Sequence, residues 1–80
     1  MPKLKILSAK DIIRIFGSFG FVAVGQKGSH IKLERKLKSS VQTLTIPNHK
    51  EIDRGTTGAI YRQALKYISE EDLEKHFYSE

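Results

Sequence analysis

Two segments in which apolar and polar residues alternate strictly constrain the fold of this chain more than any other feature. The first, His30 to Lys36, has the sequence HIKLERK, and the second, Val41 to Ile46, has the sequence VQTLTI. A period of two residues is typical of a strand with one buried and one solvated face. We therefore expect two neighbouring antiparallel strands, joined by a polar connection over residues 37–40 and ended by Pro47.

A third strand is predicted just before these two. Phe21 to Lys27 (FVAVGQK) is aromatic and β-branched at its start, and only Gly28 and Ser29 separate it from His30. A two-residue break that contains glycine is typical of a tight hairpin turn. The sequence therefore predicts a three-stranded antiparallel sheet.

Residues 8–19 are predicted to form a helix ahead of the sheet. Ser8 and Asp11 have the spacing of a capping box, and Gly20 is a natural helix stop. The inward face is predicted from apolar residues at helical spacing: Ile12, Ile13, Phe16 and Phe19.

Two more helices are predicted after a loop over residues 47–55. Thr56 or Thr57 caps a helix that runs to about Ile68, and Ser69 with Asp72 starts a short C-terminal helix. The inward residues of the longer helix are predicted to be Ile60, Ala64, Leu65 and Ile68. The whole is an α+β fold of order α-β-β-β-α in one domain over residues 1–80, with helices on one face of the sheet and the other face solvated.

The charge of the chain favours anionic binding partners. The chain has 14 Lys and Arg against 9 Asp and Glu, a net charge of +5, which favours nucleic acid, an anionic membrane surface or an acidic protein. No apolar stretch approaches the roughly 20 residues that span a bilayer. The absence of cysteine fits a reducing compartment, so we expect a cytoplasmic protein that does not cross a membrane.

His30 is the first candidate for chemistry. Alternation places it with Lys32 and Lys36 on the solvated face of its strand, whereas Ile31, Leu33 and the stem of Arg35 face inward. Imidazole exchanges protons near neutral pH, so it can act as a general base. Lys27 and Lys32 could hold a phosphate, and Gly28 would let that phosphate approach the backbone. On spacing alone, a solvated strand histidine with no special role is the simpler interpretation.

Other patterns give weaker signals. His49 lies in a loop (PNHK) for which an ordinary turn is the simpler interpretation, and His76 on the last helix is expected to be solvated or to have a helix-terminal role. The spacing of the histidines does not favour a metal site, and Gly55 to Gly58 lacks the lysine of a phosphate-binding loop. The start of the second helix at residues 54–57 could offer backbone N–H groups to a phosphate, although plain capping explains it as well.

Four blocks of sequence resemble a known family. In chain order they are AKDIIRIFGSFGF, QKGSHIKL, TIPNHKEIDRGT and IYRQA, and the resemblance covers about residues 8–69. The most specific elements are GF at 20–21, GSH at 28–30, PNH at 47–49 and GT at 55–56. In their order and spacing these blocks resemble the HicA toxins, small ribonucleases that are also called YcfA-like proteins.

The resemblance implies a fold like the double-stranded RNA-binding domain, mRNA interferase activity that inhibits translation, and neutralisation by a HicB-type antitoxin. It places the catalytic histidine of the family at His30 and the glycine of its GSH motif at Gly28. The chain departs from the family after Gly55-Thr56, where TGAI replaces a Leu and a Ser-Ile-like pair. Since glycine weakens a helix by up to about 1 kcal/mol, the departure concerns the helix onset and not His30.

With the resemblance, we expect His30 to take the proton of a ribose 2′-OH without a metal or other cofactor, and an antitoxin to cover its face. RNA contacts are expected from Lys27, Gly28, Ser29, Lys32, Lys36 and His49. The roles of Lys27 and Lys32 follow from their strand positions alone. The alternatives are a non-catalytic RNA-binding module of the same fold and a protein-interaction domain whose basic face binds an acidic partner.

Overall fold

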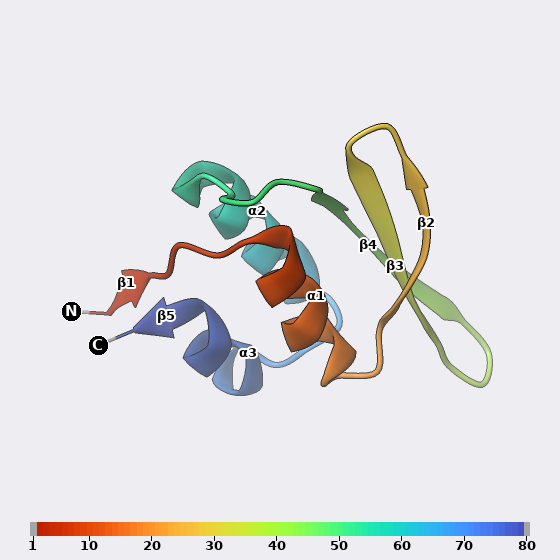
Figure 1. Cartoon of the computed structure of the whole chain (residues 1–80). Coiled ribbons are helices and arrows are strands. Elements are labelled where there is room, and N and C mark those ends of the chain that lie inside the picture. The colour runs from red at the N-terminus through yellow and green to blue at the C-terminus, as the bar shows by residue number, and fades with distance from the viewer. Residues whose placement is uncertain (1, 80) are drawn as a thin grey trace.

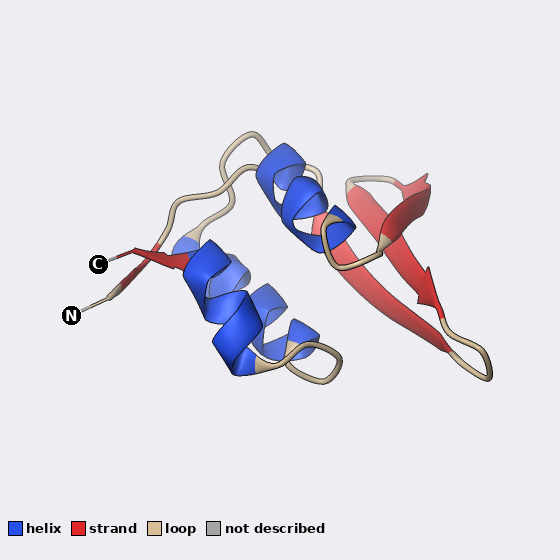
Figure 2. Ribbon diagram, turned by 90° about the horizontal axis from the view of Figure 1, so that it is seen from below, coloured by secondary structure: helices blue, strands red, loops and turns tan. Residues whose placement is uncertain are grey.

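The computed structural model describes residues 2–79 and confirms the α+β class and the α-β-β-β-α order (Figure 1). Its elements are β1 (Lys3–Leu4), α1 (Ala9–Gly17), β2 (Val22–Lys27), β3 (His30–Lys36), β4 (Val41–Pro47), α2 (Arg54–Ala64), α3 (Glu70–Phe77) and β5 (Tyr78–Ser79). The helices form one layer and the three-stranded sheet lies beside them (Figure 2). The likeness to the double-stranded RNA-binding domain stays a prediction.

The sheet has the predicted antiparallel order β2-β3-β4. Along β3 the burial alternates as predicted, because Ile31 and Leu33 are buried while His30 and Lys32 are exposed. The register pairs His30 with Pro47 and Lys36 with Val41 across β3 and β4. We call the solvated side of this sheet the open face; it carries His30, Lys32, Glu34 and Lys36 of β3.

The edge strand β2 is less covered than the sequence suggests. All of its residues are exposed, and its pairing with β3 shifts between Ala23 and Gly25, where a bulge interrupts the ladder. Its apolar residues Val22 and Val24 are 61% and 49% exposed. The buried residues of the sheet therefore come from β3 and β4.

The predicted capping box of α1 is confirmed. The Ser8 Oγ accepts a hydrogen bond from the Asp11 N–H at 3.0 Å, and the Asp11 carboxylate accepts one from the Ser8 N–H at 3.0 Å. The helix ends at Gly17 rather than Phe19, with Ser18 as its C-cap. Gly20 has φ +97°, which suits glycine, and allows the chain to reverse so that the Phe21 N–H donates to the Phe16 carbonyl at 3.0 Å.

The predicted bounds of α2 are wrong at both ends. The helix begins at Arg54 and its N-cap is Asp53, whose carboxylate accepts from the Thr56 N–H at 2.9 Å and from its hydroxyl at 2.8 Å. An aspartate is the better cap, so Thr56, three residues later, lies within the first turn. The helix ends at Ala64, and the buried Ile68 follows in a turn. Gly58 lies inside α2, where a Cβ would stand 3.7 Å from Leu4.

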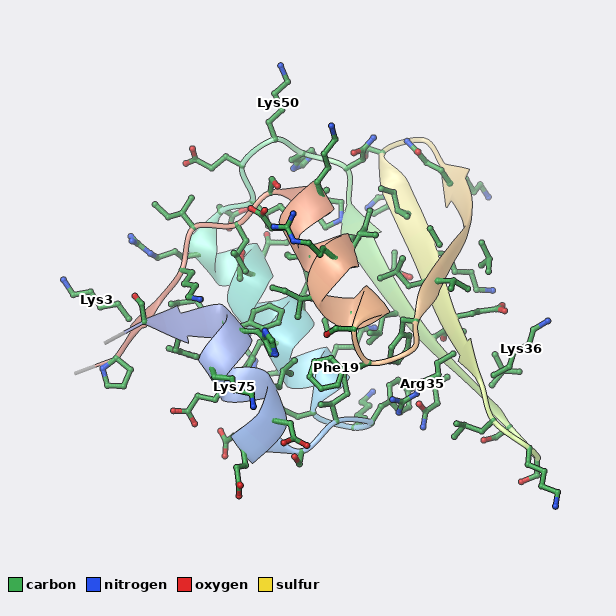
Figure 3. The ribbon with its side chains drawn as sticks, turned by 60° about the horizontal axis from the view of Figure 1, so that its bottom comes forward. Lys3, Phe19, Arg35, Lys36, Lys50 and Lys75 are labelled. Atoms are coloured by element: carbon green, nitrogen blue, oxygen red, sulfur yellow. The ribbon has the colours of Figure 1, made fainter. Side chains whose placement is uncertain are left out.

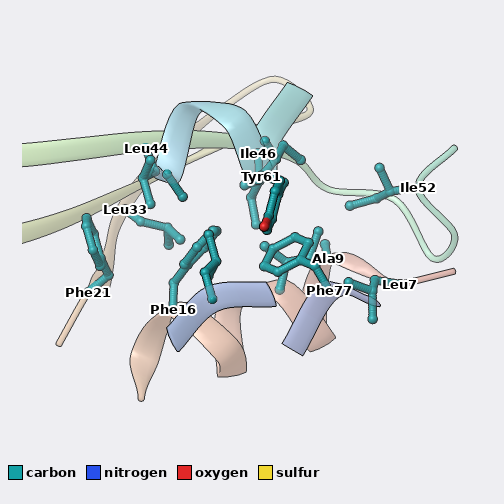
Figure 4. Close-up of a cluster of buried hydrophobic side chains, with 14 of the residues drawn as sticks. Leu7, Ala9, Phe16, Phe21, Leu33, Leu44, Ile46, Ile52, Tyr61 and Phe77 are labelled. Atoms are coloured by element: carbon teal, nitrogen blue, oxygen red, sulfur yellow. The ribbon is translucent and has the colours of Figure 1, made fainter. Parts of the chain in front are cut away.

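The core lies between the inner side of the sheet and the helices. Its largest fully buried side chains come from all layers and include Phe16 of α1, Leu33 and Leu44 of the sheet, and Phe77 of α3 (Figure 4). The rings of Phe16 and Phe77 lie 5.8 Å apart. The short strands β1 and β5, which the sequence did not predict, pair antiparallel and bring the two ends of the chain together.

Arg35 fixes the sheet to the helical layer. Its stem faces inward, as predicted, and its guanidinium donates to the Gln42 side chain at 2.8 Å, the Phe19 carbonyl at 2.9 Å and the Tyr67 carbonyl at 3.1 Å. The guanidinium also lies 4.8 Å from the centre of the Phe21 ring. One strand thus presents an anchoring side chain on one face and His30 on the other.

Candidate active site

The hairpin turn between β2 and β3 positions His30. Lys27 pairs with His30 across the turn, so that Gly28 and Ser29 alone form the loop. Gly28 has φ +60°, and its carbonyl accepts a hydrogen bond from the Gln26 side chain at 2.9 Å. A glycine at the first position of a two-residue loop matches the strand twist without strain. The turn therefore places His30 at one end of the open face.

Two shallow grooves meet at His30. The first has a volume of about 320 Å³ and brings His30 together with Lys27 and Lys32, as predicted, along with Gly25, Gln26 and Thr45. The Lys32 ammonium lies 3.7 Å from the Glu34 carboxylate. Because an exposed ion pair of this kind is weak, Lys32 is still able to approach an anion in the groove.

The second groove lies between β4 and α2 and has a volume of about 500 Å³. His30 and His49 both line it, together with Thr45, Thr56, Ile60 and Gln63. His30 and Thr45 line both grooves, which therefore adjoin at these two residues. Within residues 2–79, neither groove has an acidic residue in its lining.

Backbone hydrogen bonds hold the loop of His49 against the turn of His30. The Asn48 N–H donates to the Ser29 carbonyl at 2.6 Å, which joins the residue before His49 to the residue before His30. On the other side, the His49 carbonyl accepts from the Ala9 N–H at 2.9 Å, at the start of α1. The position of His49 is therefore set by contacts to both the sheet and the helical layer.

Not every predicted RNA contact lies near His30. Lys36 shares the open face but stands six residues further along β3, about 20 Å away at the rise of a strand. Figure 3 shows Lys36 toward the far end of the sheet and Lys50 on the loop that follows β4. Ser29 lies in the turn, where its carbonyl binds the loop of His49.

The start of α2 borders the second groove through Thr56. The hydrogen bonds from the side chain and backbone of Thr56 lower the pKa of Asp53, and the positive charge of His49 contributes to the same shift. Because Asp53 already accepts the Thr56 N–H, capping accounts for this donor at the helix start.

His76 differs from the other two histidines. It lies in the last turn of α3, which is the helix-terminal position expected as the alternative to a solvated one. The side chain is half-buried, with its ring edge-on to Phe19 at 5.5 Å between ring centres. It is not part of the lining of either groove. His76 therefore offers a matched control for substitutions of His30 and His49.

The described chain has neither a metal-binding cluster nor a membrane-spanning helix. Across residues 2–79, no three or more His, Cys, Asp or Glu side chains are grouped so that they could hold a metal ion. In the same part of the chain, no helix has the length and apolar character to cross a membrane.

A family model for the HicA toxin of bacterial toxin-antitoxin systems matches residues 9–65. The chain belongs to the HicA toxin family. The matched segment runs from the first residue of α1 to the C-cap of α2, and it contains both groove histidines. Searches of curated proteins and of solved structures gave no match.

The family gives the chain a biological setting. A HicA toxin is one half of a toxin-antitoxin system, and the family implies a HicB-type antitoxin as its partner. The sequence had suggested His30 and His49 separately. Their meeting in one groove was not predictable from spacing, because it depends on the Asn48–Ser29 hydrogen bond and on where α2 packs.

Proposed function

We propose that this chain is an endoribonuclease, an mRNA interferase that cleaves RNA and so inhibits translation in the cytoplasm. The observation that supports it most is His30, an exposed histidine that lines two adjoining grooves. Two lysines and no acidic residue belong to the described lining of these grooves. A phosphodiester backbone suits such a surface, because its negative charge meets cations and no carboxylate. Membership of the HicA toxin family fits the same activity.

In the proposed mechanism His30 acts as a general base. It accepts the proton of a ribose 2′-OH, and the resulting oxygen attacks the adjacent phosphorus. Lys27 or Lys32, which line the same groove as His30, stabilises the negative charge that develops on the phosphoryl oxygens. The product is a 2′,3′-cyclic phosphate or its hydrolysis product, and the reaction needs no metal ion.

The remaining contacts are proposed to hold the RNA. Gly28 and Ser29 let the backbone of the turn approach a phosphate, and His49 contacts the chain in the second groove. Lys36 attracts RNA further along the open face and acts on affinity rather than on chemistry. A HicB-type antitoxin is proposed to bind over His30 and so to block the access of RNA to both grooves.

The test is cleavage of a defined single-stranded RNA in EDTA by the wild type, His30→Ala and the control His76→Ala. We expect the wild type and His76→Ala to cleave, and His30→Ala to lose about 10²–10⁴-fold in rate. Circular dichroism confirms folding of each variant. Products with 5′-phosphate ends, or a requirement for magnesium, would contradict this mechanism.

A non-catalytic RNA-binding module is the second candidate. The observation in its favour is that the basic open face continues to Lys36, well beyond the grooves at His30. In such a module His30→Ala would change RNA affinity modestly, and the wild type would cleave nothing. Binding would weaken with salt in both cases, so only turnover separates the two functions.

A further inference from the structure

We propose that His49 is a second catalytic residue, the general acid that gives a proton to the 5′-oxygen of the leaving nucleotide. This inference rests on the proposed ribonuclease function and deepens it. It assigns to two histidines the two proton transfers that cleavage of RNA requires.

His30 and His49 lie in the same groove. His30 and His49 line one hollow of about 500 Å³, a size typical of sites that hold a small ligand. Among its lining residues within the described chain, these two alone have ionisable side chains; the others are threonines, a glutamine and apolar residues. A phosphate that reaches His30 through this groove can therefore also contact His49, and no other ionisable side chain of the described chain lines the groove.

Backbone hydrogen bonds hold together the two segments that carry the histidines. The hydrogen bond of 2.6 Å from the Asn48 N–H to the Ser29 carbonyl joins the residues that directly precede them. The bond from the Ala9 N–H to the His49 carbonyl, 2.9 Å long, fixes the other side of the loop. Both side chains are nevertheless exposed, so that a substrate can touch them and protons can be exchanged with water.

Cleavage of RNA requires one group that accepts a proton and one that donates a proton. The bond between the 2′-oxygen and phosphorus forms as the bond between phosphorus and the 5′-oxygen breaks. The 2′-OH proton passes to neutral His30, and a proton passes from protonated His49 to the departing 5′-oxygen. An alkoxide is a poor leaving group, so its protonation is worth about 10²–10⁴-fold in rate. Water reverses the two roles when it opens the cyclic phosphate.

The charges around His49 come from several elements. Asp53, the N-cap of α2, is close enough to feel the charge of His49, and His30 lines the same groove as His49. On its other side, His49 shares a hollow of about 500 Å³ with Lys50 and with Lys10 of α1. His49 therefore has charged neighbours of both signs.

A leaving-group experiment tests the assignment. The cleavage site of the wild type is first mapped, and the same RNA is then made with sulfur in place of the bridging 5′-oxygen at that site. A thiolate leaves without protonation, because thiols are far stronger acids than alcohols. The wild type, His49→Ala, His30→Ala and His76→Ala are compared on both substrates, and their RNA affinity is measured by fluorescence anisotropy.

We expect His49→Ala to lose about 10²-fold or more on ordinary RNA and to return to within about tenfold of the wild type on the sulfur substrate. His30→Ala should be impaired on both substrates, since the attack still needs a base. Equal loss by His49→Ala on both, or no loss on ordinary RNA, would overturn the role of His49 while leaving that of His30 intact. Absence of cleavage by the wild type would overturn the proposed function itself.

Discussion

The two faces of β3 show how one strand can serve both fold and function. On the inner face, Leu33 is fully buried and Arg35 donates three hydrogen bonds into the helical layer and β4. On the open face, His30 and Lys32 are exposed and line a groove. Alternation separates the two sets by one residue, so substitutions on one face should change stability and those on the other should change activity.

The largest effect is expected at Leu33, at the centre of the inner face. Leu33→Ala should lower the free energy of unfolding by about 2–5 kcal/mol, because it removes buried methyl groups and leaves a cavity. Urea denaturation measures the change. The neighbouring Lys32→Ala, on the open face, should stay within about 0.5 kcal/mol of the wild type; a comparable loss there would break the separation of the faces.

A smaller loss of stability is expected at Arg35. Arg35→Met keeps much of the apolar stem but removes the donors to Gln42, Phe19 and Tyr67, which should cost about 1–3 kcal/mol. Lys36→Met, one residue on and exposed, is the matched control and should leave unfolding almost unchanged. Equal denaturation midpoints for the two variants would show that the Arg35 contacts contribute nothing net.

On the open face, distance from His30 should grade the effect on activity. Lys32→Ala should lower the cleavage rate about tenfold, equivalent to about 1.4 kcal/mol, because Lys32 lines the groove of His30. Lys36→Ala, at the far end of β3, should weaken RNA binding and leave the rate at saturating RNA unchanged. Single-turnover rates over a range of protein concentration separate the two. If Lys36→Ala lowered the rate at saturating RNA and Lys32→Ala did not, RNA would be cleaved elsewhere on the open face and not at His30.

The smallest effect concerns the cap of α1, outside both faces. Ser8→Ala should lower the melting temperature by about 4–8 °C at neutral pH. The hydrogen bonds from the Ser8 backbone and side chain hold the pKa of Asp11 below its ordinary value, so the stability they give is present above the unfolded pKa and lost as pH falls through the folded one.

The difference between the wild type and Ser8→Ala should therefore narrow below about pH 4. Thermal melts from pH 7 down to pH 2.5 measure it, and NMR titration of Asp11 should show a higher pKa in the variant. A gap that stays constant with pH would mean that the Ser8 side chain does not affect the ionisation of Asp11, whose carboxylate also accepts from the Ser8 backbone N–H.

The sequence predicted best those elements whose bounds are set by consecutive residues, and it missed those whose bounds depend on the packed chain. The bounds of β3 were predicted correctly, because alternation and the Gly28 turn are written in consecutive residues. The start of α2 was not, because Asp53, Thr56 and Thr57 are all possible caps and only the packed chain selects Asp53. Strands β1 and β5 have two residues each and exist because the chain ends meet, which no local pattern records.

The candidate site follows the same rule. The grouping of His30 with Lys27 and Lys32 was predictable, because one hairpin carries all three. The approach of His49 was not, since it depends on a hydrogen bond between segments nineteen residues apart, Ser29 and Asn48. Lys36 lies on the same face as His30 but outside its groove, a separation that the six-residue spacing and the rise of a strand already imply.

The separation of stability and activity between the two faces of β3 is tested with His30→Ala and Leu33→Ala. Both the free energy of unfolding and the rate of RNA cleavage are measured for each variant. The account predicts that His30→Ala unfolds within about 0.5 kcal/mol of the wild type and cleaves RNA at least about 10²-fold more slowly. It predicts that Leu33→Ala is the less stable by about 2–5 kcal/mol, while its folded fraction cleaves at the wild-type rate. An active, well-folded His30→Ala would contradict it.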